Sequence, residues 1–555
     1  MTRPDHSETT PSPIALWGLV VAVFLAETLL HSPAQRLLLL WPDATEYLLI
    51  GNSWAQGTGF VDPVQWYKIP EAGQVMPAFS VRAPLVPFMF GIAFWLGSSV
   101  LTIIHLHAVW SAFAVGLLAL GASRVMRLPA AAAAALWVGV FPAWVQLSRV
   151  PMTETTAVAC VALVAWSLRF ASQSIGGAAF CAALTLIAWL TRPNLAGMAV
   201  AAFVAMMISA RPRPTLRNVP AWAYLATFVF GFVVIREVTL AWTGYTPYSG
   251  YALLGRYLDS RAAEGFSLEP AAGLLELVLD RPADVAKRVG TLLFGMYRQL
   301  FSTDRFSWIG WLGAPGILWC LWGGRKYQVE RRFLAFCALG FTAVTALTLG
   351  YWDGLRYPLL TAVTGALCGI ALLDDLCEYA ARALPAGVLA RSMSLVPFGV
   401  TIAAIVVLGN PRHVIGPNFG WPLRDTQSLE PMLTPLDRST QALCHEIPRN
   451  TFVTAHDPWR VSFWCGNPAT AVPLDFNYPK VRRAFLSLRR PAYLVQVAGR
   501  QANRGRDLPR IVPIAETERM NLYRVIGVES PIEWTAPPPV GCAGRLPACL
   551  ESVDR

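Results

Sequence analysis

Two acidic residues three positions apart, Asp43 and Glu46, are the first candidates for chemistry in this sequence. They open an apolar stretch that ends at the glycine pair of residues 57–60. Residues three apart share one face of a helix, so both carboxylates would point into the same space. One carboxylate could act as a general base while the second tunes it or binds a metal. The alternative for Asp43 is a structural role as the N-cap of the helix that follows Pro42.

Arginines next to prolines form a second group of candidates. Arg82 precedes Pro84 and a further apolar stretch, where it could bind a phosphate or a carboxylate, or simply contact lipid headgroups. Arg149 and Glu154 flank a proline at the end of another apolar run, and a surface ion pair is the alternative there.

Two tight turns supply further candidates. Arg192 lies in the turn at residues 190–194, and Asp353, Arg356 and Tyr357 lie in the turn at residues 351–358. Each of these residues alone is typical of an anchor at the membrane interface.

The composition indicates which kind of molecule must position these residues. Of the 555 residues, 55% are hydrophobic and only 14% are charged, against about 25% charged in an average soluble domain. A soluble monomer this apolar would expose apolar patches larger than such proteins tolerate. The net charge of +11 gathers in short loops between apolar segments, which fits membrane topology better than nucleic-acid binding.

Apolar runs predict an α-helical polytopic membrane protein with about 11 transmembrane helices. The runs cover residues 14–30, 100–122, 130–147, 155–171, 177–191, 194–209, 219–242, 308–322, 333–350, 357–373 and 394–409. The run at 84–97 is too short to span and is predicted to be an interfacial helix. Residues 1–13 are polar and are predicted to be a disordered tail, and residues 14–410 form the membrane domain.

Basic loops orient these helices. With the N-terminus in the cytoplasm and eleven spans, the basic segments at 124–127, 211–217, 325–332 and 382–391 all fall on the cytoplasmic side. The first loop (31–99), the loop at 243–307 and everything after about residue 410 then face outside. Amphipathic stretches at 272–279 and 285–301 are predicted to lie along the membrane surface.

This topology places the charged candidates on one face of the membrane. They are Asp43, Glu46, Arg82, Arg149, Glu154, Arg192, Asp353 and Arg356. Carboxylates among arginines suit a displacement at a carbon that is linked to phosphate. Arginine stabilises the leaving phosphate, and an aspartate deprotonates the incoming hydroxyl.

Residues 411–555 predict a small soluble α/β domain outside the membrane. Short apolar runs at 451–455, 461–464, 492–497 and 521–525 are typical of strands. The cysteines Cys444, Cys465, Cys542 and Cys549 could pair outside the cytoplasm, Cys542 with Cys549 most easily, or remain free thiols. Residues 456–460 are either a loop that could cover the site or a turn between strands.

The order Asp43-x-x-Glu46-Tyr47, Gly57-x-Gly-Phe60 and Arg82-x-Pro84 resembles the first outer loop of the glycosyltransferase C superfamily. That superfamily includes the protein mannosyltransferases and the bacterial aminoarabinose transferases. Segments 148–154, 190–193 and 356–358 are also similar to its pattern, as is the layout of about eleven spans with an extracytoplasmic C-terminal domain. The likeness covers roughly residues 14–375. A single proline after Arg82 replaces the commoner double proline, and no histidine-rich or Asp-x-Asp metal motif is present.

The resemblance implies a glycosyltransferase of the inner (plasma) membrane with a catalytic first outer loop. It would move a sugar from a polyprenyl-phosphate donor to a hydroxyl of a lipid, glycan or protein acceptor on the extracytoplasmic face, with inversion at the anomeric carbon. Asp43 would be the general base, with Glu46 as the second catalytic acid. The donor phosphate would be bound by Arg82, Arg149, Arg192 or Arg356, and substrate contacts would come from Glu154, Asp353 and Tyr357. No nucleic acid is implied, no cofactor is certain, and a divalent cation is left open.

Two other functions compete with this one. A transporter predicts charges at the bilayer midplane and repeated halves with broken helices. Glu27, His105, His107 and the pair at 236–237 lie in or near spans, but the two halves show no convincing repeat. A lipid-linked polysaccharide polymerase or ligase would also use outer-loop arginines. Its large catalytic loop usually lies late in the chain, whereas the acidic motif here is in the first loop.

Overall fold

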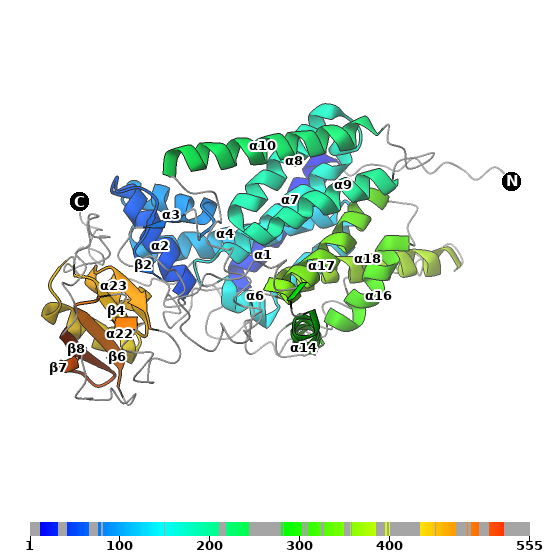
Figure 1. The fold of residues 1–555 in the computed structure, drawn as a ribbon. Coiled ribbons are helices and arrows are strands. Elements are labelled where there is room, and N and C mark those ends of the chain that lie inside the picture. The colour runs from blue at the N-terminus through cyan, green and yellow to red at the C-terminus, as the bar shows by residue number, and fades with distance from the viewer. Residues whose placement is uncertain are drawn as a thin grey trace.

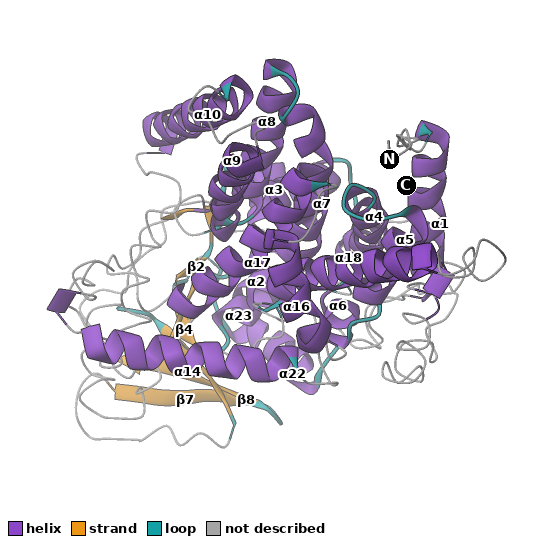
Figure 2. Cartoon of the chain, turned by 90° about the vertical axis from the view of Figure 1, so that its right-hand side faces the viewer, coloured by secondary structure: helices purple, strands orange, loops and turns teal. Residues whose placement is uncertain are grey.

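The computed structural model is mostly helical, with the strands gathered at one side of the molecule (Figures 1 and 2). The structure describes residues 12–30, 42–65, 76–78, 82–148, 150–209, 218–243, 279–280, 282–301, 306, 309–322, 327–348, 356, 358–383, 395–396, 399, 433–449, 451–472, 485–486, 490–498 and 510–526. The statements below concern these residues.

Most of the predicted apolar runs form helices of one bundle. They are α1 (Pro13–Leu30), α4 (Val100–Ala122), α7 (Thr153–Ala171), α8 (Ile175–Thr191), α9 (Gly197–Ser209), α10 (Val219–Thr243), α16 (Ile309–Trp322), α17 (Gln328–Thr348) and α18 (Leu359–Ala383). Side-chain caps begin four of them. Ser12 accepts from the Ala15 N–H at the start of α1, and Ser99 accepts from the Thr102 N–H before α4. Ser174 accepts from the Gly177 N–H before α8, and Asn218 accepts from the Ala221 N–H at the start of α10. The helices share one apolar core rich in alanine, whereas much of α10 exposes large apolar side chains, which suits contact with lipid.

Four of the described helices are long and apolar enough to cross a membrane. They are Val100–Ala122, Thr153–Ala171, Val219–Ala241 and Leu359–Arg382. The first has 23 residues, or about 35 Å of helix, against about 30 Å of bilayer hydrocarbon. The total of eleven spans stays a prediction, since most of the run at 394–409 lies outside the described residues. Helix α3 (Leu85–Trp95) matches the predicted short helix at 84–97.

The apolar run at 130–147, predicted as one transmembrane helix, is not a single unbroken helix, because the structure divides it into α5 (Leu128–Gly139) and α6 (Pro142–Leu147). Pro142 causes the break. The ring of a proline disfavours the helical conformation of the residue before it, and Phe141 accordingly has φ −58° and ψ 130°.

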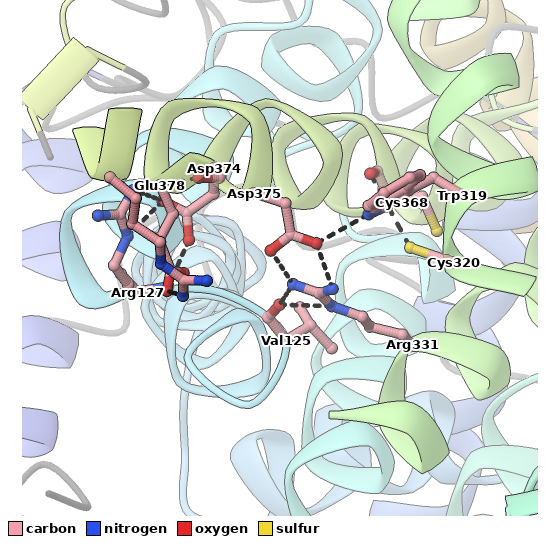
Figure 3. Close-up of polar contacts among 10 residues, drawn as sticks. Val125, Arg127, Trp319, Cys320, Arg331, Cys368, Asp374, Asp375 and Glu378 are labelled. Carbon is pink, nitrogen blue, oxygen red and sulfur yellow. Dashed lines mark hydrogen bonds and ion pairs between the residues drawn. The ribbon is translucent and has the colours of Figure 1, made fainter. Parts of the chain in front are cut away.

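Described residues of three predicted basic segments, 124–127, 325–332 and 382–391, lie at one end of the bundle, and Figure 3 shows contacts at this end. The segment 211–217 lies outside the described residues. Arg331 on α17 donates to the carbonyl of Val125 at 2.8 Å, and Arg127 donates to Asp374 on α18 at 2.8 Å. Arg332 donates to a carbonyl in the last turn of α9 at 3.2 Å. The loop after α4, the last turn of α9, the start of α17 and the end of α18 therefore lie at one end of the bundle, as the loop charges predict.

A mixed six-stranded sheet forms the core of the C-terminal region. Its order is β2 (Val64–Gln65), β5 (Ala469–Ala471), β4 (Val453–Ala455), β6 (Tyr493–Val497), β8 (Met520–Ile526) and β7 (Arg510–Glu516). The first four strands are parallel to one another, and β8 pairs antiparallel with both β6 and β7. Strand β2 comes from the first loop of the membrane region, so the sheet joins segments about 400 residues apart.

Three of the predicted C-terminal strands are present as β4, β6 and β8, but the strand predicted at 461–464 is wrong. These residues belong to helix α23 (Pro458–Cys465), which has proline in its first turn and ends at Gly466 in the left-handed conformation. The segment 456–460 leads into this helix. Before it come α22 (Pro435–Leu443) and the short helix η8 (Cys444–Glu446). Cys444 forms a disulfide with Cys465, while Cys542 and Cys549 lie outside the described residues.

The predicted amphipathic stretch at 285–301 is helix α14 (Pro282–Leu300). Val285, Met296 and Leu300 are buried on one side, and Phe294 and Tyr297 are exposed. The stretch predicted at 272–279 lies almost wholly outside the described residues.

Candidate active site

The first loop folds into a compact unit around helix α2 (Pro42–Ala55), which carries Asp43 and Glu46. Helix α3 packs closely on α2: a Cβ on Gly51 would lie 2.7 Å from the Pro87 carbonyl oxygen, so glycine is required at this contact. Strand β1 (Val61–Asp62) pairs antiparallel with β3 (Met76–Pro77). The Arg82 N–H donates to the Ala78 carbonyl at 2.6 Å, just after β3. The hairpin therefore brings Arg82 back to α2.

Arg82 bridges the two acids of α2. Its Nη2 lies 2.9 Å from Asp43 Oδ1, and its Nε donates to Glu46 Oε2 at 2.6 Å. The guanidinium also lies 5.8 Å from the centre of the Tyr47 ring, within the range of a cation–π contact. The sequence spacing placed the two carboxylates on one face of the helix, and the structure shows that one arginine holds both.

Two further arginines extend this bridge to the helix bundle. Arg356, which precedes α18, pairs with Asp43 Oδ2 and lies 3.5 Å from Glu154 through its Nε. Arg192, which follows α8, donates to the same Glu154 oxygen at 2.6 Å. The order Glu46, Arg82, Asp43, Arg356, Glu154, Arg192 is thus a continuous chain of alternating charges, which we call the charge chain.

Most of the charge chain is buried, and its residues Arg192 and Arg356 are half-buried. The side chains of Glu46 and Glu154 are fully covered, and that of Arg356, the most accessible of the six, is 17% exposed. Buried ion pairs are costly to desolvate and contribute little net stability compared with well-packed apolar residues. Six ionisable side chains from five separate segments, four of them buried and two half-buried, are therefore a functional-site candidate on physical grounds.

Helix ends favour this arrangement. Asp43 and Glu154 lie in the first turns of α2 and α7, where the positive end of the helix dipole stabilises a carboxylate. Arg192 is the residue directly after α8, where the negative end stabilises a cation.

The acids of the first loop differ in pKa. Burial raises the pKa of Asp43, but Arg356 and Arg82 outweigh this and hold it well below its usual value. Burial raises the pKa of Glu46 well above its usual value, with repulsion from Asp62 and Asp43 adding to the effect and Arg82 opposing it. Asp43 is therefore an ionised carboxylate at neutral pH, while Glu46 tends towards the protonated acid.

Asp62 is an acid of this site that sequence reasoning missed. It is 2% exposed, and its Oδ1 accepts from the Val64 N–H at 2.9 Å. Burial raises its pKa from 3.8 to about 6, with repulsion from Asp43 adding to this and Arg82 opposing it. Asp62 follows the Gly-x-Gly-Phe segment directly, but only the β1–β3 pairing shows that it turns back towards α2.

The structure brings together Asp43, Glu46, Arg82, Glu154, Arg192 and Arg356. The predicted site residues Arg149, Asp353 and Tyr357 lie outside the described residues. The catalytic and binding roles assigned to these nine residues stay predictions. Within the described part of the chain, no group of three or more histidine, cysteine or acidic residues is arranged to hold a metal ion.

Comparisons with solved structures establish the fold. An oligosaccharyltransferase of Archaeoglobus fulgidus tethered to an acceptor peptide is 12% identical, with a TM-score of 0.52 over 88% of this chain and 69% of that chain. The same archaeal enzyme, AglB, with an inhibitory peptide and a dolichol-phosphate has a TM-score of 0.51 at 12% identity, over 88% of this chain and 70% of that chain. ArnT of Cupriavidus metallidurans bound to undecaprenyl phosphate has a TM-score of 0.46 at 13% identity, over 92% of this chain and 98% of that chain.

No protein-family model matches the sequence, and no curated protein matches it at a significant level. The likeness to the archaeal oligosaccharyltransferase is therefore one of fold. This chain shares the fold of that membrane enzyme, as the predicted resemblance requires.

Proposed function

We propose that this protein is a membrane glycosyltransferase that moves a sugar from a polyprenyl-phosphate donor to a hydroxyl of a lipid, glycan or protein acceptor. The observation that carries the proposal is the charge chain. Its three arginines converge on two carboxylates, so that a phosphate and a reacting hydroxyl could be bound side by side. Arginine suits a phosphate oxygen because its planar guanidinium donates several hydrogen bonds in a fixed geometry.

The proposed reaction is a displacement at the anomeric carbon. The acceptor oxygen forms a bond to this carbon as the bond from the carbon to the phosphate oxygen breaks, and attack opposite the phosphate inverts the configuration. The phosphate leaves with the electron pair, and the developing charge is stabilised by arginines already held in place by their carboxylate partners. The acceptor hydroxyl gives its proton to Asp43, which its arginines keep ionised.

The low pKa of Asp43 sets the timing of this proton transfer. A weakly basic carboxylate does not deprotonate a free hydroxyl efficiently. The proton becomes acidic only when the hydroxyl oxygen has begun to bond to the anomeric carbon. Asp43 is therefore proposed to accept the proton late in the displacement, with Glu46 on the other side of Arg82 tuning its charge.

The fold supports the same class of donor and acceptor. The archaeal enzyme of the same fold has been captured with an acceptor peptide and with a dolichol-phosphate. A lipid-linked phosphate also suits a charge chain at the ends of membrane helices. The transporter alternative predicts charges at the bilayer midplane, whereas Glu154 and Arg192 lie at the first turn and the end of their helices.

The proposal includes the orientation of the chain. The end with the charge chain, and the C-terminal unit at 411–555, are proposed to face the extracytoplasmic side of the inner membrane, with the basic end shown in Figure 3 in the cytoplasm. Arg149, Asp353 and Tyr357 are proposed to contribute to donor and substrate binding. A divalent cation is proposed only as an optional component, to be tested by chelation.

The test is mass spectrometry of glycolipids and glycoconjugates from cells that carry the wild-type protein, Asp43→Asn or no protein. The wild type is expected to yield a glycosylated product that is absent from the other two. Asp43→Asn should be present in the membrane at normal amounts. Glu518→Gln, which changes an exposed side chain in the turn between β7 and β8, serves as the active control. Full product from Asp43→Asn would contradict the assignment of Asp43 as the base.

A further inference from the structure

Helix α23 of the C-terminal unit packs directly on α2, the helix that carries the acids. Phe463 and Trp464 are buried in one apolar cluster with Ala44, Tyr47 and Leu48. These three α2 residues have the i, i+3, i+4 spacing of one helix face, and Asp43 and Glu46 each precede one of them by one position. A change in the tilt or rotation of α2 on α23 would therefore move both carboxylates.

The C-terminal sheet holds the first loop at a second point. Val64 and Gln65 of β2 pair in parallel with Ala469 and Thr470 of β5, and the Ala469 N–H donates to the Pro63 carbonyl at 3.2 Å. Asp62 directly precedes these residues. The same sheet therefore fixes the backbone next to the third acid of the site.

Asp437 accepts hydrogen bonds from two residues of α23 and so holds this helix in place. It is fully buried, and its Oδ1 accepts from Arg460 Nε at 2.9 Å and from Trp464 Nε1 at 3.1 Å. Its Oδ2 accepts from the N–H of Thr434 at 2.9 Å and completes the cap of α22. One carboxylate thus ties the start of α22 to two turns of α23, including the tryptophan that packs on α2.

We propose that Asp437 is a positioning residue of the site: through Arg460 and Trp464 it holds α23 against α2 and so sets the placement of Asp43 and Glu46. The C-terminal unit is then a structural part of the active site rather than an appended module. This inference deepens the proposed function, and its activity measurement rests on that function, but its structural measurement does not.

The structural test is hydrogen–deuterium exchange of the full-length protein in nanodiscs. Asp437→Ala removes both bonds to α23, and amides of residues 42–55 are expected to exchange faster while those of α16, which has no residue in this cluster, are unchanged. The matched control is Thr434→Ala, which weakens the cap of the same helix α22 but leaves Arg460 and Trp464 bonded to Asp437. Trp464→Phe keeps an aromatic side chain on α2 but removes the indole N–H that donates to Asp437. It is the milder variant to be used should Asp437→Ala fail to fold.

Measurements of transfer activity distinguish a role of Asp437 in positioning α2 from a general loss of protein stability. Asp437→Ala and Trp464→Phe are expected to lower kcat about tenfold, within the range of a small misplacement of catalytic groups, with little change in the KM for the donor. Thr434→Ala should keep near-normal kcat. The proposal is overturned if residues 42–55 exchange at the wild-type rate while 433–472 exchange faster, or if Thr434→Ala has the same effects as Asp437→Ala. If the wild type transfers no sugar, the proposed function fails, and the exchange experiment still decides the role of Asp437.

Discussion

Arg356 is the residue of the charge chain that joins Asp43 of the first loop to Glu154 of the helix bundle, since it pairs with Asp43 and also contacts Glu154. It connects the first loop to the bundle across more than 300 residues of sequence. Removing it would leave Asp43 with Arg82 and Glu154 with Arg192, so each carboxylate keeps a partner. Substitution of Arg356 therefore tests binding with less risk of unfolding than removal of an acid would carry.

Arg356→Ala is expected to raise the KM for the lipid donor about tenfold or more, since a hydrogen bond between charged groups contributes about 1.5–3 kcal/mol. The measurement is the initial rate of transfer against donor concentration in membranes. Arg382→Ala removes an arginine whose ion pair with Glu378 is largely exposed, at the opposite end of α18, and serves as the control. Equal donor KM values for the two variants would remove Arg356 from the donor site.

Asp62 makes stability depend on pH. Its pKa is raised from 3.8 to about 6 in the folded protein, chiefly by burial. The folded state therefore binds more protons than the unfolded state between these values, and stability is expected to fall as pH rises from about 4 to about 6. Asp62→Asn should reduce this fall in melting temperature, measured by thermal unfolding in detergent across that range. Glu518→Gln should keep the wild-type slope, and a wild-type slope in Asp62→Asn would contradict the prediction.

The sequence predicted part of the site because its residue types and helical spacing are local signals. Asp43 and Glu46 share a helix face, and the arginines stand beside prolines at helix ends. The partners in each ion pair were not predictable, because residues 43 and 356 meet only after the bundle has formed. Asp62 was missed for the same reason: its position depends on a short hairpin between segments with little strand signal of their own.

At the scale of elements, α16 and α18 show how closely these helices pack. A Cβ on Gly316 would clash with the backbone of Gly369, whereas a Cβ on Gly365 would lie 3.8 Å from the Gly313 Cα. Small residues that let helix backbones approach are a common means of association in membranes. This contact matters for the site because α18 begins just after Arg356.

Gly316→Ala is expected to separate α16 from α18 and to cost about 1–3 kcal/mol, as overpacking does in cores. Gly365→Ala adds the same methyl group where there is room, and it should be neutral or slightly stabilising because alanine favours helix over glycine by about 1 kcal/mol. Melting temperatures of the two variants in detergent test this. The packing argument would be refuted by equal melting temperatures.

Most helices were predictable because a membrane span needs a long apolar run, and the runs match α4, α7, α8 and α10 within a few residues. Two elements were not. Residues 461–464 are apolar enough for a strand, but they form part of α23, where Phe463 and Trp464 face another helix. Strand β2 has two residues, and its pairing with β5 is a tertiary contact that no local pattern encodes.

At the scale of the whole molecule, charged groups separate to the two ends of the helices. The charge chain lies at the starts of α7 and α18, and the basic cluster of Figure 3 lies at the ends of α4 and α18. The length of α4 alone puts about 35 Å between the two ends. Among the described residues, the C-terminal unit contacts the end with the charge chain through β2 and α23. The candidate active site and the C-terminal sheet must therefore face the same side of the membrane, whichever way the chain is oriented.

Labelling of single introduced cysteines tests this orientation. Gln56→Cys lies in the first loop, directly after α2, and Glu518→Cys lies in the turn between β7 and β8. Gln173→Cys lies in the exposed turn between α7 and α8, at the opposite end of α7 from Glu154 of the charge chain. A membrane-impermeant maleimide added to intact cells should label the first two, and it should label Gln173→Cys only after the membrane is opened, because the basic loops beside that turn favour the cytoplasm.

The six free cysteines among the described residues are buried, so the unsubstituted protein measures any background from Cys542 and Cys549. Labelling of Gln56→Cys and Gln173→Cys from the same side would contradict the separation of the two ends. Labelling of Gln173→Cys alone in intact cells would keep the separation but invert the proposed orientation.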